Sequence, residues 1–457
     1  MTTKAVWLVV ADPLTARTFF DCGIVGRLAE QLGERLRVAF TFPRSEADEW
    51  AARVPAGVRT LHADDLYPED VAVPERVRRR ADRWLDQRIG YFPLAIRLNL
   101  RHGFHRERMA PGHRNQLLDS SRVGPLPVRP AVERWMRRWH FSPRRHVASA
   151  LLRQLETERP HLVLSNLQMQ SATPFIVLGR RLGLRTVGYV ASWDHTVGKG
   201  VIWNGLARYV VQNERMRDDL VRYHGVDAGR IVVTGWPQAD VFHERRPRRA
   251  FEDVLRRYGL DPVLPLVLVM GNTPTNMPYE GRFFDRLVEW WAETGADRRF
   301  SLLFRPHPRD GEWEKRFACA IGRPGVAVQE PSHTDIDVLA TLLQHADAVV
   351  SNAGTVLLDA LVNDRPAVCV LYDEGAPPGE CWAAKSVIGE HYRDVATSGA
   401  FYEARAFDEV LAGIERCLEA PGELHMQRRS VTARAVGPLD GRSAERVVHA
   451  ILEELRP

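Results

Sequence analysis

The sequence predicts an α/β protein built from two doubly wound parallel sheets. Apolar runs with β character alternate with helical segments along most of the 457 residues, the pattern of parallel strands joined by crossover helices. A charged stretch broken by proline, residues 243–250, divides this alternation into two series. Polar turns follow several of the expected strands, as they do at the edge where open α/β sheets bind ligands.

The first series begins with an expected strand at 5–11, followed by an expected polar loop at 12–21. An arginine-rich helical insertion at about residues 65–145 interrupts the alternation. The remaining elements expected before the linker are a helix at 23–32, a strand at 37–42, a helix at 146–159, a strand at 161–165, a helix at 175–182 and strands at 185–189 and 209–212.

The second series repeats the alternation after the linker. Its expected strands are 265–270, 300–304, 348–350 and 367–371. Its expected helices are 281–294, 337–343, 356–361 and, at the end of the chain, 443–455. Two similar α/β halves are therefore predicted.

Composition agrees with a globular protein. With 45% hydrophobic residues the chain can bury sizeable cores, and its length indicates two or three domains. Apolar runs such as 263–270 are shorter than the ~18 residues of a membrane-spanning helix, and the run at 5–11 is too short for a secretory signal. We expect a cytoplasmic protein. Its five cysteines form no CxxC pair, which favours reduced, buried thiols over zinc or disulfides.

Basic side chains gather in one region although the net charge is only +5. Residues 75–145 combine clustered arginines with interleaved tryptophan, tyrosine and phenylalanine. Such a surface can attract phosphate-rich lipid headgroups or a phosphorylated acceptor, so peripheral contact with the inner membrane face is one interpretation. Solvated helix faces with inward aromatics are the other. Nucleic acid is the less favoured partner.

The turn after the expected strand 348–350 is the strongest binding signal. Ser351, Asn352, Gly354 and Thr355 lie between this strand and a helix, where backbone N–H groups and the helix dipole favour an anion such as phosphate. Asp359, one turn further on, could accept hydrogen bonds from a ribose. An ordinary βα unit with Thr355 as a helix cap is the alternative.

Two further turns carry groups suited to a diphosphate. Arg305 and His307 follow the expected strand 300–304, and prolines on both sides of His307 hold its ring at the strand end. Gly271, Asn272 and Thr273 follow the expected strand 265–270. These groups could stabilise the negative charge of a phosphate group through charge and oriented N–H groups without a metal.

Four segments resemble the ordered motifs of the GT-B glycosyltransferase superfamily, nearest the CDP-glycerol glycerophosphotransferase-like and UDP-glycosyltransferase branch. They are VTGWPQADVF, LLFRPHP, SNAGTVLLDALVNDRPAV and GPLDGRSAERVV. The resemblance covers roughly residues 160–457. The chain differs in two places, because the transferases typically carry an acidic Ser-Asp-Tyr-Ser type turn at 351–355, and the segment before residue 150 matches no known pattern.

The resemblance implies two Rossmann-like domains facing each other across a cleft. Residues 1–242 would form the acceptor domain and residues 251–435 the nucleotide-donor domain, with a C-terminal segment, 436–457, crossing back to the first domain. The co-substrate would be a nucleotide-diphosphate sugar, with no permanently bound cofactor and a hydroxyl-bearing acceptor.

A base is needed to take the proton of the acceptor hydroxyl, and Asp194 and His195 follow the expected strand 185–189. In an extended segment their side chains would point in opposite directions. A turn-forming Asp194 and a surface His195 are the structural alternative. Lys199, between two glycines, could reach a phosphate, and Asp12 or Asp21 are further candidates for the base.

No metal site is predicted. The sequence Asp335-Ile336-Asp337 has the DxD form, but it precedes an expected helix, and N-capping is the simpler explanation. The histidines are scattered without a ligand spacing.

The leading functional hypothesis is a transferase that moves a sugar to a hydroxyl acceptor in envelope polysaccharide or secondary-metabolite glycosylation. Transfer of glycerol phosphate from CDP-glycerol to a polymer is an alternative, marked by release of CMP. A UDP-sugar 2-epimerase would need no acceptor, and a non-catalytic binding module is least favoured.

Overall fold

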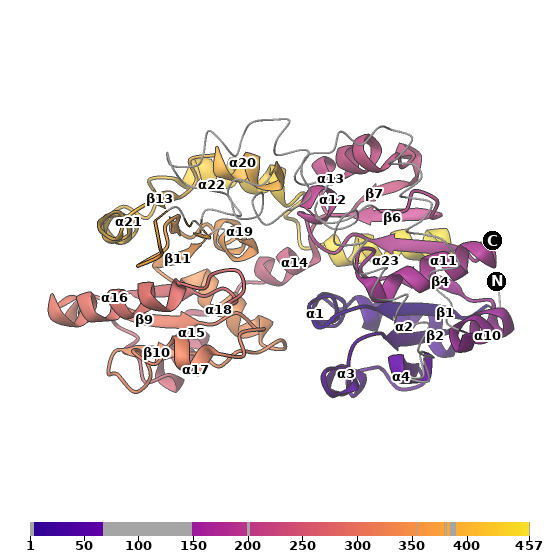
Figure 1. Cartoon of the computed structure of the whole chain (residues 1–457), viewed down its shortest axis with the longest axis horizontal. Coiled ribbons are helices and arrows are strands. Elements are labelled where there is room, and N and C mark those ends of the chain that lie inside the picture. The colour runs from indigo at the N-terminus through magenta and orange to yellow at the C-terminus, as the bar shows by residue number, and fades with distance from the viewer. Residues whose placement is uncertain are drawn as a thin grey trace. The chain divides into compact units, whose positions relative to one another are not determined.

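The computed structural model describes residues 4–66, 149–198, 202–352, 354–378, 380, 382–383 and 390–456 (Figure 1). The chain divides into two compact units. The first unit runs to Asp240 and resumes at Val436, and the second comprises Val241–Ala435. Almost all of the predicted arginine-rich insertion, as well as Lys199, lies outside the described residues.

The described part of the first unit contains one parallel sheet of seven strands in the order β3-β2-β1-β4-β5-β6-β7. The chain starts in the middle, moves to one edge, and returns to build the other side, so the predicted doubly wound topology is confirmed. The strands are β1 Val6–Val10, β2 Leu36–Phe40, β3 Arg59–His62, β4 His161–Leu164, β5 Thr186–Tyr189, β6 Arg208–Val211 and β7 Ile231–Val233.

Helices join these strands, as parallel strands require. They are α1 Pro13–Asp21, α2 Ile24–Leu32, α3 Arg44–Ala51, α4 Ala63–Leu66, α10 Ser149–Glu158, α11 Thr173–Arg181, α12 His195–Gly198, α13 Glu214–Asp219, α14 Pro237–His243, which continues into the second unit, and α23 Ser443–Glu454. Short helical turns are η1 Gly33–Arg35, η4 Gln170–Ala172, η5 Leu220–His224 and η6 Ala228–Arg230.

The expected loop at 12–21 was wrong, because helix α1 occupies it. Asp12 caps this helix: its carboxylate accepts hydrogen bonds from the backbone N–H groups of Leu14 and Thr15, at 3.0 and 3.1 Å. Pro13 stands at the first helical position, where its fixed φ suits the helix and its missing N–H costs nothing. The sequence Asp12-Pro13 therefore marked the start of a helix.

The second unit repeats the topology with a parallel sheet in the order β10-β9-β8-β11-β12-β13. Its strands are β8 Leu266–Met270, β9 Ser301–Arg305, β10 Val326–Val328, β11 Ala348–Asn352, β12 Ala367–Val370 and β13 Tyr402–Ala404. Its helices are α15 Arg248–Arg257, α16 Glu280–Glu293, α17 Trp313–Arg316, α18 Ile336–His345, α19 Thr355–Val362, α20 Arg393–Ala396, α21 Phe407–Glu419 and α22 His425–Ala435, with short turns η7 Ala296–Arg298 and η9 Glu390–Tyr392.

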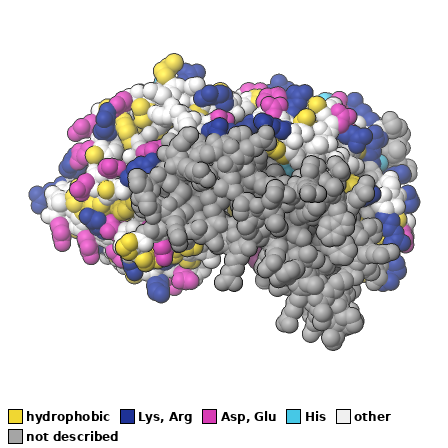
Figure 2. Space-filling view, turned by 45° about the horizontal axis from the view of Figure 1, so that its top comes forward, with side chains coloured by type: hydrophobic (Ala, Val, Ile, Leu, Met, Phe, Trp, Pro, Cys, Tyr) yellow, Lys and Arg dark blue, Asp and Glu magenta, His cyan; other side chains and the backbone are white. Residues whose placement is uncertain are grey.

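Apolar side chains fill both faces of these sheets. All five residues of β1, β8 and β11 are buried, which explains why the strands read as continuous apolar runs instead of alternating ones. In the second unit Phe284 and Phe317 stack with ring centroids 4.5 Å apart, which anchors α16 and the segment after α17 beneath β9. None of the described helices is both long and apolar enough to cross a membrane. Acidic and basic side chains are interspersed on the face in Figure 2.

The motif VTGWPQADVF, which also ends an apolar run with a Gly/Pro turn and a carboxylate, packs against the C-terminal helix. The Asp240 carboxylate accepts hydrogen bonds from the backbone N–H groups of Ser443 and Ala444, at 3.0 and 2.7 Å. Gly235 has a φ of +90°, and a Cβ there would lie 2.4 Å from the Ser443 hydroxyl. Arg446 also donates to the carbonyl of Thr234 at 2.6 Å. Two of the family-like motifs therefore serve to dock helix α23 within the first unit.

Candidate active site

Three of the predicted polar turns meet at one edge of the second sheet. Strands β9, β8 and β11 are neighbours and parallel, so the segments that follow them emerge side by side. The N–H of Gly271 donates to the carbonyl of Arg305 at 2.9 Å, and the Asn272 amide donates to the Asn352 amide oxygen at 3.2 Å. The structure therefore brings together the ends of β9, β8 and β11, with the predicted polar residues that follow them, at the carboxyl edge of an open sheet.

Gly271 has a packing role in this arrangement. A Cβ at this position would lie 2.9 Å from the ring of Phe317 and 3.6 Å from the carbonyl oxygen of Arg305. The turn can pass this close to β9 only because residue 271 has no side chain. Asn272 and Thr273 then follow at the sheet edge, where they are partly exposed.

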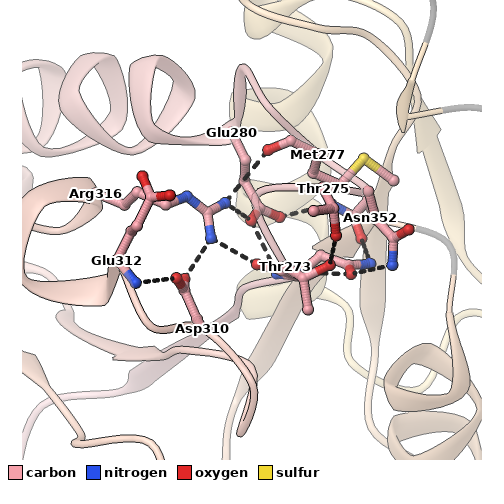
Figure 3. A network of polar contacts seen from close by, with 10 residues as sticks. Thr273, Thr275, Met277, Glu280, Asp310, Glu312, Arg316 and Asn352 are labelled. Atoms are coloured by element: carbon pink, nitrogen blue, oxygen red, sulfur yellow. Dashed lines mark hydrogen bonds and ion pairs between the residues drawn. The ribbon is translucent and has the colours of Figure 1, made fainter. Parts of the chain in front are cut away.

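Beneath the Asn272 turn lies a buried polar network (Figure 3). The Glu280 carboxylate, at the start of α16, accepts hydrogen bonds from the Asn272 N–H at 2.8 Å, the Asn352 amide at 2.6 Å and the Arg316 guanidinium at 2.6 Å. Arg316 also donates to the Asn272 carbonyl at 2.6 Å and pairs with Asp310. One ion pair thus ties α16 and α17 to the ends of β8 and β11.

The environment of Glu280 shifts its ionisation. Burial raises the pKa of its carboxyl to about 7, while Arg316 and the hydrogen bonds from Asn272 and Asn352 act in the opposite direction. Sequence reasoning missed Glu280 and Arg316 because an acid near a helix start and a base in a short helix are ordinary surface residues in most chains.

Arg305 is buried at the end of β9, and protein groups occupy its guanidinium. Arg305 is only 5% exposed. Its guanidinium forms a bidentate ion pair with Asp335, at 2.7 and 2.8 Å. Gln329 accepts a further hydrogen bond from it at 2.5 Å. The guanidinium therefore links β9 to the segment between β10 and α18, so this side chain does not offer the predicted contact to a diphosphate.

The same ion pair corrects the explanation of the DxD sequence. Asp335 occupies the N-cap position of α18, but its side chain makes no capping hydrogen bond. Its carboxylate is occupied by Arg305 and by the Gln329 amide, at 2.6 Å. Asp337 pairs instead with Arg246 at 2.6 Å. The two acids of the DxD sequence thus serve two separate ion pairs. In the part of the chain that the structure describes, no group of three or more His, Cys, Asp and Glu residues is arranged to hold a metal.

His307 presents a ring nitrogen suited to donating a hydrogen bond. The residue is partly exposed after β9, and its Nδ1 accepts a hydrogen bond from the Arg309 N–H at 3.0 Å. A nitrogen that accepts carries no proton, so the neutral ring carries its proton on Nε2. The His307 carbonyl accepts from the Asp310 N–H at 2.8 Å, which holds the turn. These contacts fix the ring in the tautomer that can donate from Nε2.

The start of α19 is open to a ligand. Gly354 is the N-cap with an extended φ of −176°, it provides no side-chain cap, and a Cβ there would meet no atom within 4 Å. Thr355 is exposed at the first helical position, so it is not the cap that the alternative interpretation required. Ser351 is buried and donates its hydroxyl hydrogen to the Asn352 carbonyl at 2.8 Å. This helix start has the space and the polarity for an anion.

Asp359 does not match its predicted role. The residue is 2% exposed on the buried side of α19, whereas a ribose contact needs an accessible carboxylate. Its backbone carbonyl accepts hydrogen bonds from the N–H and the side-chain amide of Asn363. The apolar periodicity of the helix indicated a buried face, but Asp359 was predicted to be within reach of a ribose and not to belong to that face.

A pocket opens beside this network at the ends of β8, β11 and β12. Tyr279, Glu280, Ser351, Asn352 and Tyr372 are among its lining residues. Sequence reasoning missed its two tyrosines, although a Tyr-Asp-Glu sequence directly after an expected strand, 372–374, was a usable signal.

The loop after β12 closes one side of this pocket. Glu380 accepts hydrogen bonds from the Tyr279 hydroxyl at 2.9 Å and from the Trp382 indole at 3.1 Å. The Asp373 carboxylate accepts from the backbone N–H groups of Trp382 and Ala383, at 2.6 and 3.1 Å. These contacts tie the loop to the segment before α16.

Asp194 and His195 stand together at the end of β5 in the first unit. His195 Nε2 lies 4.0 Å from an Asp194 carboxylate oxygen, so the expectation of opposite directions was wrong. The chain turns at Ser192–Asp194 and enters helix α12, which brings the two side chains to the same side. The Ser192 hydroxyl donates to Asp194 at 2.5 Å. A carboxylate beside an imidazole is a suitable arrangement for a base.

A buried histidine holds the turn that carries His195. His224 is fully buried, and its Nδ1 accepts a hydrogen bond from the Ile202 N–H at 2.9 Å. Its Nε2 therefore carries the proton and donates to the Thr196 carbonyl at 2.7 Å. The Thr196 hydroxyl donates to the Asp219 carboxylate at 2.8 Å.

The two fallback candidates for the base serve the fold. Besides its two capping bonds, the Asp12 carboxylate accepts hydrogen bonds from the Thr15 hydroxyl at 2.9 Å and the Asn166 amide at 3.1 Å. Asp21 is paired with Arg53 at 2.5 Å. These contacts give both carboxylates a structural role in the first unit.

Comparison with known proteins supports the architecture. A family model described as CDP-glycerol:poly(glycerophosphate) glycerophosphotransferase matches residues 158–453. The S. aureus MnaA–UDP co-structure has 11% identity and a TM-score of 0.58, covering 99% of this chain and 97% of that one. UDP-GlcNAc 2-epimerase from Neisseria meningitidis bound to UDP-GlcNAc has 10% identity and a TM-score of 0.56, covering 98% and 100%.

A putative UDP-N-acetylglucosamine 2-epimerase from Listeria monocytogenes has 13% identity and a TM-score of 0.55, covering 100% of this chain and 97% of that one. At such low identities the likeness concerns the fold alone, and it confirms the predicted GT-B architecture. A search of curated proteins found no match.

Replacing Gly354 with valine should weaken nucleoside-diphosphate binding while leaving the fold intact. The new side chain would enter open space at the start of α19, where the extended backbone accepts any residue. We expect at least an about tenfold loss of affinity, or about 1.4 kcal/mol, in calorimetric titrations with CDP and UDP. Gly422→Val, also in open space, is the matched control. Unchanged affinity in folded Gly354→Val would remove the assignment of this turn.

Proposed function

Because the chain belongs to the CDP-glycerol:poly(glycerophosphate) glycerophosphotransferase family, we propose that it transfers an alcohol phosphate from a CDP-linked alcohol to a hydroxyl acceptor. The family and the GT-B fold make the protein a transferase of this general type. The alcohol, the acceptor and the cytidine nucleotide are the proposed details.

One observation carries the proposal: His307 and the open start of α19 lie at the same edge of the second sheet. The sheet order puts the segments that follow β9 and β11 on either side of the Asn272 turn, so the partly exposed His307 ring and the first N–H groups of α19 belong to one edge, where one ligand could contact both. Oriented donors of this kind stabilise negative charge that develops on a leaving phosphate.

The reaction is a displacement at phosphorus. The acceptor oxygen attacks the phosphorus that carries the alcohol, a new P–O bond forms, and the bond to the bridging oxygen of the diphosphate breaks. CMP leaves with the electron pair of that bond, and the acceptor proton goes to a base. Asp194 or His195 is the proposed base, and His307 with the start of α19 is the proposed site for the leaving phosphate.

Sugar transfer, the hypothesis that the sequence placed first, is the second candidate. Its support is the turn at 351–355, which has no acidic residue where the transferases of the resembling branch typically carry one. In that reaction the bond between the sugar carbon and the diphosphate breaks, and a nucleoside diphosphate leaves. Peripheral membrane contact through the arginine-rich insertion stays a prediction in either case.

The product of the reaction decides between these functions. The protein should be incubated with CDP-glycerol or with UDP-sugars, in each case with glycerol-phosphate and sugar acceptors, and the released nucleotide identified by chromatography. We expect CMP, released only when an acceptor is present. Release of a nucleoside diphosphate would establish sugar transfer instead, and conversion of a UDP-sugar without an acceptor would indicate an epimerase. No turnover of any donor by folded protein would contradict the proposal.

His307→Ala should lower turnover by about 10²- to 10³-fold and change donor affinity much less, because its Nε2–H acts mainly on charge that develops as the leaving group departs. The measurement is steady-state kinetics with the donor identified above. His449→Ala, an exposed histidine of α23, is the control. A turnover number close to that of the wild type would rule out the role of His307.

Replacing the base should stop transfer while nucleotide binding persists. We expect this behaviour from Asp194→Ala, because a carboxylate needs no change of tautomer to accept a proton, and a smaller loss from His195→Ala. Turnover and CDP affinity are to be measured for each variant. If both variants keep full turnover, the base lies elsewhere in the chain.

A further inference from the structure

We propose that Glu280 is a positioning residue whose ionised carboxylate fixes the direction of a chain of hydrogen bonds ending at the turn that begins at Asn272. The inference rests on the proposed function, since it treats this turn as part of the donor site. Glu280 touches no ligand in this scheme and acts through Asn352 and Asn272.

The chain has three links. Glu280 Oε1 accepts a hydrogen bond from the Asn352 side-chain nitrogen at 2.6 Å. The Asn352 oxygen accepts from the Asn272 side-chain nitrogen at 3.2 Å. The Asn272 oxygen in turn accepts from the backbone N–H of Thr273 at 2.8 Å and from the Asn276 amide at 3.3 Å. Every donor along this path points towards Glu280.

Both ends of the chain impose this direction. An ionised carboxylate can only accept, so Asn352 must turn its nitrogen towards Glu280. At the other end the Thr273 N–H can only donate, so Asn272 must turn its oxygen towards it. The two amides between these ends have one orientation that satisfies both, and in that orientation the turn at 272–276 is held closed on itself.

The second carboxylate oxygen of Glu280, Oε2, also has donors that cannot reverse, so the direction of the hydrogen bonds has no alternative. Oε2 accepts from the Asn272 N–H at 2.8 Å and from the Arg316 guanidinium at 2.6 Å, and neither donor can reverse. Glu280, Arg316 and Asp310 are all buried, and two carboxylates share one guanidinium. A buried network of this kind is strongly affected when one member is left without its partner.

Protonation of Glu280 would break the chain. Since Oε2 faces two fixed donors, a proton would have to sit on Oε1, opposite the Asn352 nitrogen. Asn352 would then rotate its amide and set its nitrogen against the nitrogen of Asn272, and the Thr273 N–H would lose its ordered partner. When Glu280 is protonated, the chain of hydrogen bonds therefore no longer holds the turn at 272–276.

Burial and the charges around Glu280 decide the pH at which its carboxylate is protonated. Arg316 approaches from α17, Asp310 reaches the same guanidinium from the preceding segment, and Asp373 and Glu374 line the adjoining pocket from the loop after β12. Burial raises the pKa of Glu280 to about 7. The ionised, ordering form is thus complete above neutral pH and is lost as the pH falls through that value.

Nucleotide affinity should follow this ionisation. We expect the affinity for CDP or UDP, whichever binds, to be highest near about pH 8 and to fall by up to about tenfold per pH unit below about pH 7. In Glu280→Gln the amide nitrogen would oppose either Asn352 or the donors at Oε2. This variant should bind about tenfold more weakly at about pH 8 and show little pH dependence.

A double variant tests the direction of the chain itself. In Glu280→Gln with Asn352→Asp, the glutamine oxygen accepts from the Asn272 N–H and Arg316, and its nitrogen donates to the new aspartate. That aspartate also accepts from the Asn272 side chain, so each hydrogen bond is restored with the same net charge. We expect most of the lost affinity to return. Glu415→Gln, which removes a surface ion pair with Arg299 in the same unit, is the control and should keep both the affinity and the pH dependence.

The measurements are calorimetric titrations of folded protein with CDP and with UDP across this pH range, with melting temperatures for every variant. Pairwise rescue with a pH-dependent wild type supports the proposal. Wild-type-like binding by Glu280→Gln at every pH, or a folded double variant no better than the single one, overturns it. If Glu280→Gln does not fold, the double variant still decides. A wild type that binds neither nucleotide contradicts the proposed function instead.

Discussion

The buried ion pair between Glu280 and Arg316 is the interaction on which the site in the second unit depends. Glu280 Oε2 lies 2.6 Å from the Arg316 guanidinium, and both residues are less than a tenth exposed. Removing two charges from water is costly, and the cost is offset only where every remaining lone pair and N–H group finds a partner. Asn272, Asn352 and Asp310 are those partners. Satisfying the ion pair therefore fixes the ends of β8 and β11, which is where a ligand would be held.

Parallel strands explain why distant segments converge on this pair. The carboxyl ends of β9, β8 and β11 share one edge, so the turns that begin at residues 271 and 306 and the start of α19 at Gly354 lie along this edge although about 80 residues separate Gly271 from Gly354. The same principle does not make every turn a ligand site. The turn at Gly235 also follows a strand, but helix α23 fills its surroundings and Asp240 caps that helix.

Sequence patterns predicted most of the sheet and little of the network beneath it. Continuous apolar runs identified β1, β8 and β11, because burial on both faces selects apolar side chains locally. Helix α1 was missed because Asp12 and Pro13 signal either a turn or a helix start. The role of Arg305 could not be predicted, since its partner Asp335 stands 30 residues away and a lone arginine at a strand end suits a phosphate equally well. Asp194 and His195 stay predicted candidates for the base, and their shared direction depends on a turn into α12 that periodicity does not encode.

Burial separates two kinds of polar residue at the edge of the second sheet. Glu280, Arg305 and Arg316 are buried, and protein groups engage their charged ends, so they can order the site but cannot reach a ligand. His307 and Thr355 are partly or fully exposed and have their donors oriented by the backbone around them. A group that contacts a ligand must give up the water bound to it. It loses little further conformational freedom on binding when neighbouring groups already hold it in the required geometry. The burial of a charged motif residue thus decides whether it can contact a ligand or only position other residues. That burial cannot be known from the sequence alone.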